Sequence, residues 1–520
     1  MKKIFASIIA ISVFAACSKD FLEHSPVDQQ TETSFYQNPD QALQALVAVY
    51  NQLNIGDFDN IHLVSELASD NCFGGGGTSD LTWKQWDRGQ ESSNMNLGVW
   101  QKYYTGIYRA NVLLSKLEGV NWGADSTLKN TYAAEARFLR AYFYFDLVRF
   151  FGNVPLVTKQ LTVSEYNTPQ ATPADVYKLI AEDLKFAAER LPAIAYAGIP
   201  GSNYGRVTKW AAESLIGRVF LYYTGYYNQN DLAGVVTKAQ AINYLEDVIT
   251  TGGYDLVDSF PRLWQAAGRS FVGEDNKETI WSIKFTHKGL GNWDQKNGNR
   301  MQVHIGIRNQ VLNPYYKGWG AGTVNPRLWN AYDGNDTRRN ASIISIEDEN
   351  LTGYAVGDQS QYTGYFWKKY QPLNEGNADS KGGNFQIDNY FDNIVIRYAD
   401  VLLMAAELNL EGNLSKAQTY YNQVRDRAFL GTSGRKTLTT ADGKRLIMEE
   451  RRLELALEGV RYWDLLRQGM NVAKAAIDNN SSDPQFVVNF RTETQGLFKI
   501  PEQEINLSSG VYKQNPGWAN

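Results

Sequence analysis

Residues 398–428 have the sequence YADVLLMAAELNLEGNLSKAQTYYNQVRDRA, and this stretch decides the fold class. In its first part, 398–410, apolar residues recur at i, i+3, i+4 and i+7, the spacing of one helical face: Ala399, Leu402, Leu403 and Ala406. Gly412-Asn413 then turns the chain. A second apolar face follows, formed by Ala417, Tyr420, Tyr421, Val424 and Ala428. The segment therefore predicts a helical hairpin.

Helical hairpins of this kind, with small residues where the helices approach, are typical of tetratricopeptide repeats. A fixed period of about 34 residues does not run through the chain, however. We therefore expect degenerate repeats that are interrupted by insertions.

Helical patterns also cover most of the first half. Asn38-Pro39-Asp40 supplies an N-cap, a proline for the first helical position and an acid for the first turn, so a helix begins there. Further helices are predicted at 99–117, 132–151, 174–191, 209–223 and 239–250, and near the C-terminus at 446–458 and 462–467.

The periodicity is lost between residues 252 and 392, where Gly, Asn, Trp and Tyr mix with short β-like pieces such as 279–283. We expect a mostly α fold with degenerate tetratricopeptide-type hairpins and a long irregular region of loops and short strands. Residues 38–520 are predicted to form one composite domain. Its parts are an N-terminal helical part, 38–251, an irregular aromatic-rich insertion, 252–392, and a C-terminal helical part, 393–520.

The first residues indicate export. Two lysines precede an apolar run that is too short to cross a bilayer, so residues 1–16 have the features of a signal peptide. Ala15-Ala16-Cys17 resembles a bacterial lipobox, with Phe14 in place of the usual aliphatic residue. It predicts a lipid on Cys17, followed by a polar lead-in, 17–37. The alternative is a secreted protein with an incidental Cys17.

Composition limits the classes of partner and ligand that we expect. The formal net charge is −5, which disfavours nucleic acid as a partner. Aromatic residues make up 13% of the chain, more than an ordinary core needs, so some of them are expected to face a ligand. Cys72 has no disulfide partner once Cys17 carries lipid, and we expect a small buried side chain there.

The sequence lacks the motifs of common enzyme classes. Its four His residues form no HExxH, and there is no GxSxG, no GxxxxGK[ST] and no Cys/His cluster. Three glutamates at i, i+4 and i+8 have arginines nearby, which favours a structural salt-bridge network over paired catalytic acids: Glu450, Glu454 and Glu458, with Arg451, Arg452 and Arg461. No catalytic residue is predicted.

Two further motifs carry weaker signals. Asp333, Asn335 and Asp336 offer oxygens to Ca²⁺, but the EF-hand spacing is incomplete, so no cofactor or metal is expected and a structural calcium is the alternative. Gly74–Gly77 permits a tight turn near a ligand, although a flexible surface loop is the simpler interpretation.

Two aromatic segments are the better candidates for a binding site. Sugar rings stack their apolar C–H faces on Trp and Tyr while their hydroxyls bond to amides, carboxylates and Arg, so a glycan site mixes these side chains. The predicted ligand residues of the first segment are Trp83, Trp86, Arg88 and Asn94. Those of the second are Trp293, Arg308, Asn313, Tyr315, Tyr316, Trp319 and Trp329. The alternative for each Trp is a core position that holds a long loop down.

Five blocks, in order along the chain, resemble the SusD/RagB lipoproteins. The first two are Cys17 with DFLE (20–23), and EARFLRAY (135–142) followed by GNVPLV (152–157). The other three are RYADVLL (397–403), ERR (450–452) with EG (458–459) and RYWDL (461–465), and FKIP (498–501) with NPG (515–517). Together they cover nearly the whole chain, and the middle segment matches only in kind.

The resemblance implies a SusD-like fold and a surface-exposed outer-membrane lipoprotein, anchored through Cys17. It implies a binding protein without catalysis, which captures a glycan, or more rarely another nutrient, and delivers it to a SusC-like TonB-dependent transporter. Two alternatives stay open. One is a glycoside hydrolase that uses carboxylates of the middle segment, such as Asp294 or Asp333, and the other is a repeat scaffold that binds only its transporter.

Overall fold

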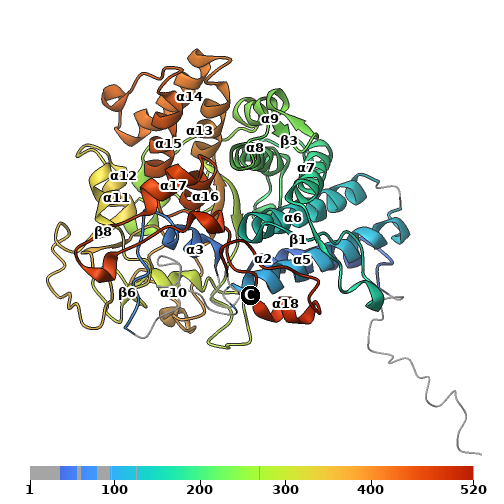
Figure 1. Cartoon of the computed structure of the whole chain (residues 1–520), viewed down its shortest axis with the longest axis horizontal. Coiled ribbons are helices and arrows are strands. Elements are labelled where there is room, and N and C mark those ends of the chain that lie inside the picture. Colours follow the sequence, from blue (N-terminus) through green and yellow to red (C-terminus); the bar gives the residue numbers. More distant parts are fainter. Residues whose placement is uncertain are drawn as a thin grey trace, which may run out of the picture.

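The computed structural model describes residues 35–54, 60–78, 94, 96–123, 126–268 and 270–518. The helices of the first half are α2 (Pro39–Asn54), α3 (Ile61–Leu67), α5 (Leu97–Lys116), α6 (Ser126–Phe151), α7 (Pro173–Arg190), α8 (Lys209–Tyr226) and α9 (Lys238–Thr251) (Figure 1). Those after the middle segment are α13 (Tyr398–Asn409), α14 (Leu414–Ala428), α15 (Gly443–Glu454), α16 (Arg461–Leu466), α17 (Met470–Ile477) and α18 (Glu502–Leu507). The predicted mostly α class is confirmed.

The long helices form one continuous stack. In this stack α6 packs on α7, α7 on α8, and α8 on α9. Helix α9 then packs on α13, and α13 packs on α14. The predicted hairpin is therefore confirmed as α13 and α14, and it extends a stack that the first half begins. Capping explains where these helices start, because the side chain of Thr172 accepts from the amide of Asp175 at α7 and that of Asn413 from Lys416 at α14.

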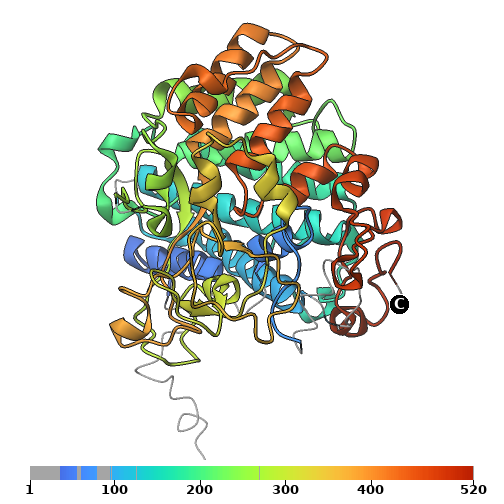
Figure 2. The ribbon, with the colours of Figure 1, turned by 90° about the vertical axis from the view of Figure 1, so that its left-hand side faces the viewer.

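The middle segment leaves this stack and returns to it through one pair of strands. β5 (Thr279–Ile283) and β10 (Asn393–Arg397) pair antiparallel, with Asn393 opposite Ile283 and Arg397 opposite Thr279. Because β10 runs directly into α13, this pairing ties both ends of the segment to the helices. Seen from the side of the segment, its long loops occupy the lower half of the molecule, below α13 to α15 (Figure 2).

Short elements hold the loops of the segment together. Its helices are α10 (Met301–Ile305), α11 (Pro326–Ala331) and α12 (Arg338–Ser342), none of which the sequence predicted. Its other strands are β6 (Ile307–Arg308), β7 (Lys317–Gly318), β8 (Ile343–Ser345) and β9 (Tyr365–Trp367). The first half adds β1 (Val154–Pro155), β2 (Gln170–Ala171), β3 (Asp231–Leu232) and β4 (Val236–Thr237).

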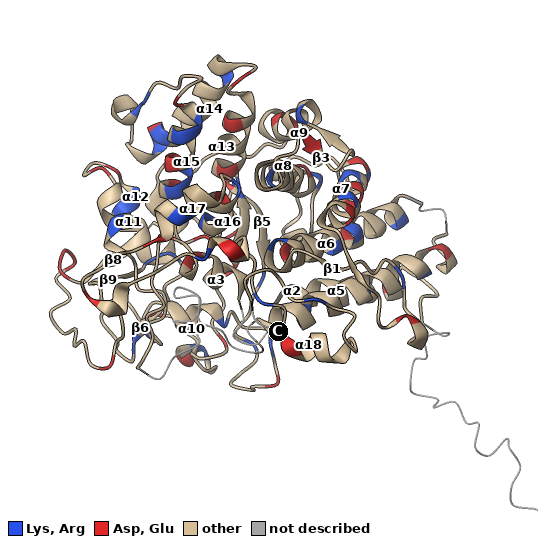
Figure 3. Cartoon of the chain, in the orientation of Figure 1, with Lys and Arg blue, Asp and Glu red and all other residues tan. Residues whose placement is uncertain are grey.

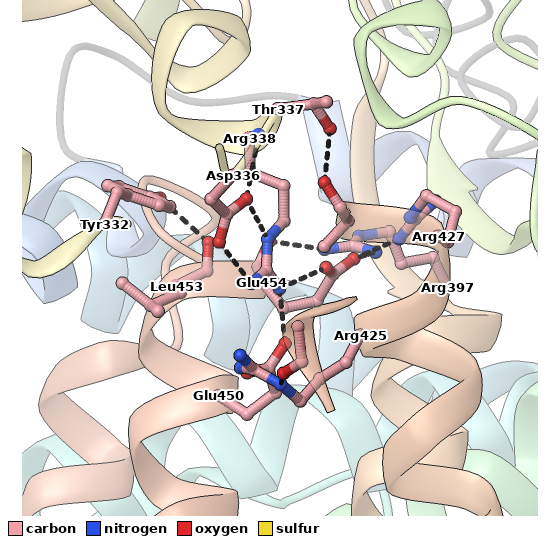
Figure 4. Close-up of polar contacts among 12 residues, drawn as sticks. Tyr332, Asp336, Thr337, Arg338, Arg397, Arg425, Arg427, Glu450, Leu453 and Glu454 are labelled. Atoms are coloured by element: carbon pink, nitrogen blue, oxygen red, sulfur yellow. Dashed lines mark hydrogen bonds and ion pairs between the residues drawn. The ribbon is translucent and has the colours of Figure 1, made fainter. Parts of the chain in front are cut away.

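A buried set of charged side chains, here called the charge network, connects the middle segment to the C-terminal helices (Figure 4). It contains as many cations as carboxylates, each at most 9% exposed: Glu278, Asp336, Arg338, Lys369, Arg397, Arg425, Arg427, Glu450, Glu454 and Glu458. Arg338, at the start of α12, donates to Glu450 at 2.6 Å and to Glu454 at 2.9 Å. Arg397 donates to Glu278 at 2.9 Å.

The glutamates of the network have the structural role that the sequence predicted, but with different partners. α15 ends at Glu454, so Glu458 does not continue the same helical face. Arg451 follows Glu450 directly and is rotated by about 100° around the helix axis, so it bonds to Asp400 and Asp464 instead. The partners of the glutamates come from distant segments: Arg338, Lys369, Arg397, Arg425 and Arg427.

Charge of both signs is also spread over the rest of the chain. Lys and Arg occur together with Asp and Glu on the helices α14 and α15 (Figure 3). Among the helices that the structure describes, none is long and apolar enough to cross a membrane.

Removal of one carboxylate from the charge network is predicted to destabilise the protein. Burial raises the pKa of Glu454, but Arg427, Arg397 and Arg338 outweigh burial and hold it well below the usual range. Glu454→Gln should lower the free energy of unfolding by about 3–5 kcal/mol, because three buried guanidinium groups lose a counter-charge. Urea denaturation near pH 7 measures this. Glu449→Gln, exposed on the same helix, is the matched control, and equal losses in the two variants would contradict the prediction.

The stability lost in Glu454→Gln is predicted to depend on pH. A carboxylate with a lowered pKa in the folded state contributes stability above its unfolded pKa of about 4.3, and loses that stability as the pH falls. Below this pH the unfolded state takes up a proton and the folded state does not. The gap between the wild type and Glu454→Gln should therefore shrink by about 1.4 kcal/mol per pH unit. Denaturation curves between pH 3 and 6 check this, and a constant gap would count against it.

Candidate functional site

The Gly74–Gly77 stretch and the second predicted aromatic segment meet at a glycine-rich pairing. Residues 72–76 run antiparallel to 320–324, and the amide of Gly76 donates to the carbonyl of Gly320 at 2.8 Å. Gly322 donates to Gly74 at 2.9 Å. Gly74–Gly77 is buried in this pairing, which corrects the expectation of a flexible surface loop. Cys72 is free and buried beside it, as the sequence predicted.

Glycine is required at this contact. Gly75 has a φ of +65°, and a Cβ there would lie 2.5 Å from the carbonyl oxygen of Gly320. Gly320 has a φ of +72°, and its Cβ would lie 2.1 Å from Oε1 of Gln359. A side chain at Gly75 would force the two backbones apart, and one at Gly320 would meet the side chains of Gln359 and Arg308 in a strained backbone conformation. The pairing therefore holds residues 72–76 directly beside Trp319.

Trp319 is fixed by backbone hydrogen bonds on both sides. Its amide donates to the carbonyl of Val303 at 2.7 Å, and its carbonyl accepts from Nη1 of Arg308 at 2.9 Å. Its ring meets that of His304 edge to face, with centroids 4.9 Å apart. The side chain is half-buried, so an oriented indole keeps part of its surface open to a ligand.

Arg308 forms a bidentate ion pair next to this indole. Its Nε and Nη2 donate to the two carboxylate oxygens of Asp358 at 2.8 and 2.7 Å. These hydrogen bonds hold the pKa of Asp358 below its ordinary value, so the carboxylate stays ionised. Val311 and Val356, within three residues of Arg308 and Asp358 in the sequence, are 46% and 45% exposed. Here an apolar surface borders an exposed hydrogen-bond acceptor.

Tyr316 lies directly before β7. Its hydroxyl donates to Asp379 at 2.7 Å, and burial together with this carboxylate raises the pKa of Tyr316 to about 12. Lys317 lies over the ring of Phe385, with Nζ 4.5 Å from the centroid. Asn313, before a cis peptide bond to Pro314, accepts from the side chain of Asn374 at 3.0 Å. These contacts hold the side chains of Tyr316, Lys317 and Asn313 in place, and most of them are polar.

Trp293 is held by the residue that precedes α10. It is 49% exposed, and its carbonyl accepts from Nη2 of Arg300, the residue before the helix, at 2.9 Å. Trp319 is held by Val303 and His304, which lie within the same helix. Arg300 and α10 therefore contact two exposed or partly exposed indoles.

Other predicted ligand residues have structural partners. Tyr315 is 1% exposed and its hydroxyl donates to Glu349. Trp329 is 9% exposed and stacks on Tyr365. The side chain of Asn94 accepts from the amide of Gln503, at the start of α18. We leave these three out of the site. Cys17, Trp83, Trp86 and Arg88 lie outside the described residues.

Asp358, Asp379 and Phe385 were not predicted. Asp358 lies in the stretch YAVGDQSQY (354–362), which mixes tyrosines with Gly, Asp and Gln as the predicted segments do. The same criterion, applied without requiring Trp, would have identified it. No local pattern marks Asp379 or Phe385, because their contacts with Tyr316 span more than sixty residues.

Asp333 of the hydrolase alternative takes part in a local turn, and Asp336 of the calcium alternative takes part in an ion pair. Asp333 accepts from the amide of Asn335 at 2.9 Å, and the carboxylate of Asp336 is occupied by Arg338 at 2.7 and 2.9 Å. Both carboxylate oxygens of Asp336 thus accept from Arg338. Within the described ranges, no group of three or more His, Cys, Asp and Glu could hold a metal ion.

Two family models match the chain. The model described as "SusD family" matches residues 348–518, and the one described as "Starch-binding associating with outer membrane" matches residues 20–221. A "SusD-like protein" of Bacteroides ovatus is 27% identical over 480 residues, which cover 87% of this chain and 80% of the relative.

Solved structures of SusD-like proteins are also similar to this chain. A "Laminarin binding SusD-like protein" is 31% identical with a TM-score of 0.78, and the match covers 93% of this chain and 100% of that one. "Surface glycan-binding protein A from Bacteroides fluxus" is 26% identical with a TM-score of 0.79, and the match again covers 93% and 100%. These relatives are named as binding proteins and not as enzymes, as the sequence analysis expected.

Gly75→Ala is predicted to loosen the pairing under Trp319. The new Cβ meets backbone atoms of Gly320 and Gly322, which side-chain motion cannot relieve. Hydrogen exchange in segments 72–76 and 320–324 should become at least tenfold faster. Gly119→Ala, whose Cβ meets nothing within 4 Å, should leave exchange there unchanged. Unaltered protection in Gly75→Ala would show that the pairing tolerates a side chain.

Proposed function

Because the chain belongs to the SusD family, we propose that it is a surface lipoprotein that binds a glycan and delivers it to a SusC-like TonB-dependent transporter. Cys17 would carry the lipid that holds it on the outer membrane. The family model named for association with the outer membrane supports this location. Binding and release, without bond cleavage, would be its whole chemistry.

The observation that carries the proposal is the oriented, half-buried indole of Trp319 beside the Arg308–Asp358 pair. An indole offers a flat apolar surface for the C–H face of a sugar ring. The exposed carboxylate of Asp358 accepts hydrogen bonds from hydroxyl groups at the ring edge. Val311 and Val356 extend the apolar surface beyond one ring. We call Trp293, Arg308, Tyr316, Trp319 and Asp358 the platform.

The charge of the platform favours a neutral glycan. Arg308 is already paired with Asp358, so its charge is compensated within the protein. An acidic sugar would have to compete with that carboxylate for the guanidinium group. The solved relative named for laminarin binding, a neutral glucan, is in line with this reading, so laminarin is the first ligand to test.

Trp319→Ala is predicted to weaken glycan binding about tenfold or more, which corresponds to about 1.4 kcal/mol. The change removes the stacking surface and leaves the backbone bonds of residue 319. Calorimetry with laminarin, followed by a panel of other glycans, measures the affinity of the chain without residues 1–17. Tyr166→Ala, which removes a 61% exposed ring outside the platform, is the control.

Equal affinity of Trp319→Ala and the wild type would refute the platform. Shortened oligosaccharides after prolonged incubation would instead support the hydrolase alternative. If no glycan binds, co-purification with the transporter tests the scaffold alternative.

A further inference from the structure

A cavity of about 80 Å³ lies where the N-terminal helices, the middle segment and the C-terminal turns meet. Its charged lining is mostly basic: His62, Lys102, Arg149, Arg218, Arg300 and Glu458. Glu458 belongs to the charge network, where Arg397 and Lys369 neutralise it. Burial lowers the pKa of His62 to about 4, so this ring is neutral at pH 7. The cavity therefore has no free negative charge among its described lining residues.

Lys102, on α5, is the cation in this lining without an ion-pair partner. Its Nζ donates to the carbonyl of Leu53 at 2.7 Å, and no carboxylate of the described residues lies within 4.0 Å of it. Burial lowers the pKa of Lys102 to about 8, with Asp146 opposing the shift, so the ammonium is still mostly charged at pH 7. A buried ammonium group needs a counter-charge, because its desolvation is costly.

Two guanidinium groups that line the same cavity as Lys102 keep unused donors. Arg149 is 8% exposed and bonds to Asp146 at 2.5 Å, yet its Nε is buried without a hydrogen-bond partner. Arg218 bonds to Asp400 and to the carbonyl of Val395, and its Nε is likewise buried without a partner. Buried donors in this state are rare in folded proteins and indicate a missing acceptor.

The surrounding ion pairs do not compensate the charge of Lys102. The cluster that continues from the cavity contains one more cation than carboxylates: Lys102, Arg149, Arg218, Arg451 and Arg467 against Asp146, Asp400, Glu407 and Asp464. The charge network, in contrast, is balanced. Lys102 is the surplus cation, since every other member has an ion-pair partner within the cluster.

We propose that this cavity binds a small monovalent anion such as chloride, held between Lys102 and the guanidinium groups of Arg149 and Arg218. Its size selects the class of ligand. A cavity of about 150 Å³ accommodates benzene, so 80 Å³ holds an anion of a few atoms and excludes a sugar ring. The bound anion would neutralise Lys102 and accept from the unused Nε donors. The site is separate from the platform and does not depend on the proposed function.

Thermal unfolding of the full chain in increasing sodium chloride, against sodium gluconate of equal ionic strength, tests the proposal. Gluconate is too large for the cavity. Chloride should raise the unfolding temperature of the wild type along a saturating curve, relative to gluconate. Lys102→Met, which keeps the length of the side chain, should lose this difference between the salts. Lys178→Met, exposed on α7, should keep it. The same salt response in the wild type and Lys102→Met would overturn the proposal.

Crystals of the wild type soaked in sodium bromide give a direct measurement that does not depend on a variant that folds. An anomalous peak within hydrogen-bond distance of Nζ of Lys102 is the expected result. A cavity without a peak, at a bromide concentration that saturates the thermal effect of chloride, would refute the site.

Discussion

The buried charge network is the constraint on which the rest of this structure depends. It joins Glu278, Arg338 and Lys369 of the middle segment to the glutamates around the end of α15, and Arg397 couples both sides to the start of α13. Buried ion pairs of this kind are weak sources of net stability, but breaking one of them is costly. The network therefore mainly determines how the middle segment packs on the helices, because any other arrangement would leave charges unpaired in the core. The β5–β10 pairing adds a second tie at the ends of the same segment.

Fixed in this way, the middle segment can carry the proposed platform, which is built almost entirely from loops. The glycine pairing between residues 72–76 and 320–324 brings a distant part of the chain to the base of Trp319. The ion pair between Arg308 and Asp358 joins a further loop to this region. Rigid loops limit the conformational entropy that a ligand must remove on binding, which is an advantage where each sugar contributes little affinity. The same loops lie outside the helical stack, so they can change in sequence without disturbing it.

The central cavity shows a different consequence of assembling one fold from three parts. The ion pairs of α6, α8 and α13 compensate one another within the stack, whereas Lys102 reaches the junction from α5 without a carboxylate of its own. The charge network thus has equal numbers of cations and carboxylates, whereas the cluster at the cavity has one surplus cation.

By itself, the sequence determined the elements whose information is local. Periodicity predicted α13 and α14, and the cap at Asn38-Pro39 predicted α2. The ligand segment around Trp319, inferred from its mixture of Trp, Asn and Arg, stays a prediction. The tertiary structure alone decided which residues meet. Tyr315 and Tyr316 are neighbours in the sequence, yet one is buried against Glu349 and the other reaches Asp379, because hydrogen bonds to distant loops set the direction of each ring. Likewise, Glu454 finds Arg338 across 116 residues and not its neighbour Arg452, since adjacent residues of a helix point to different sides.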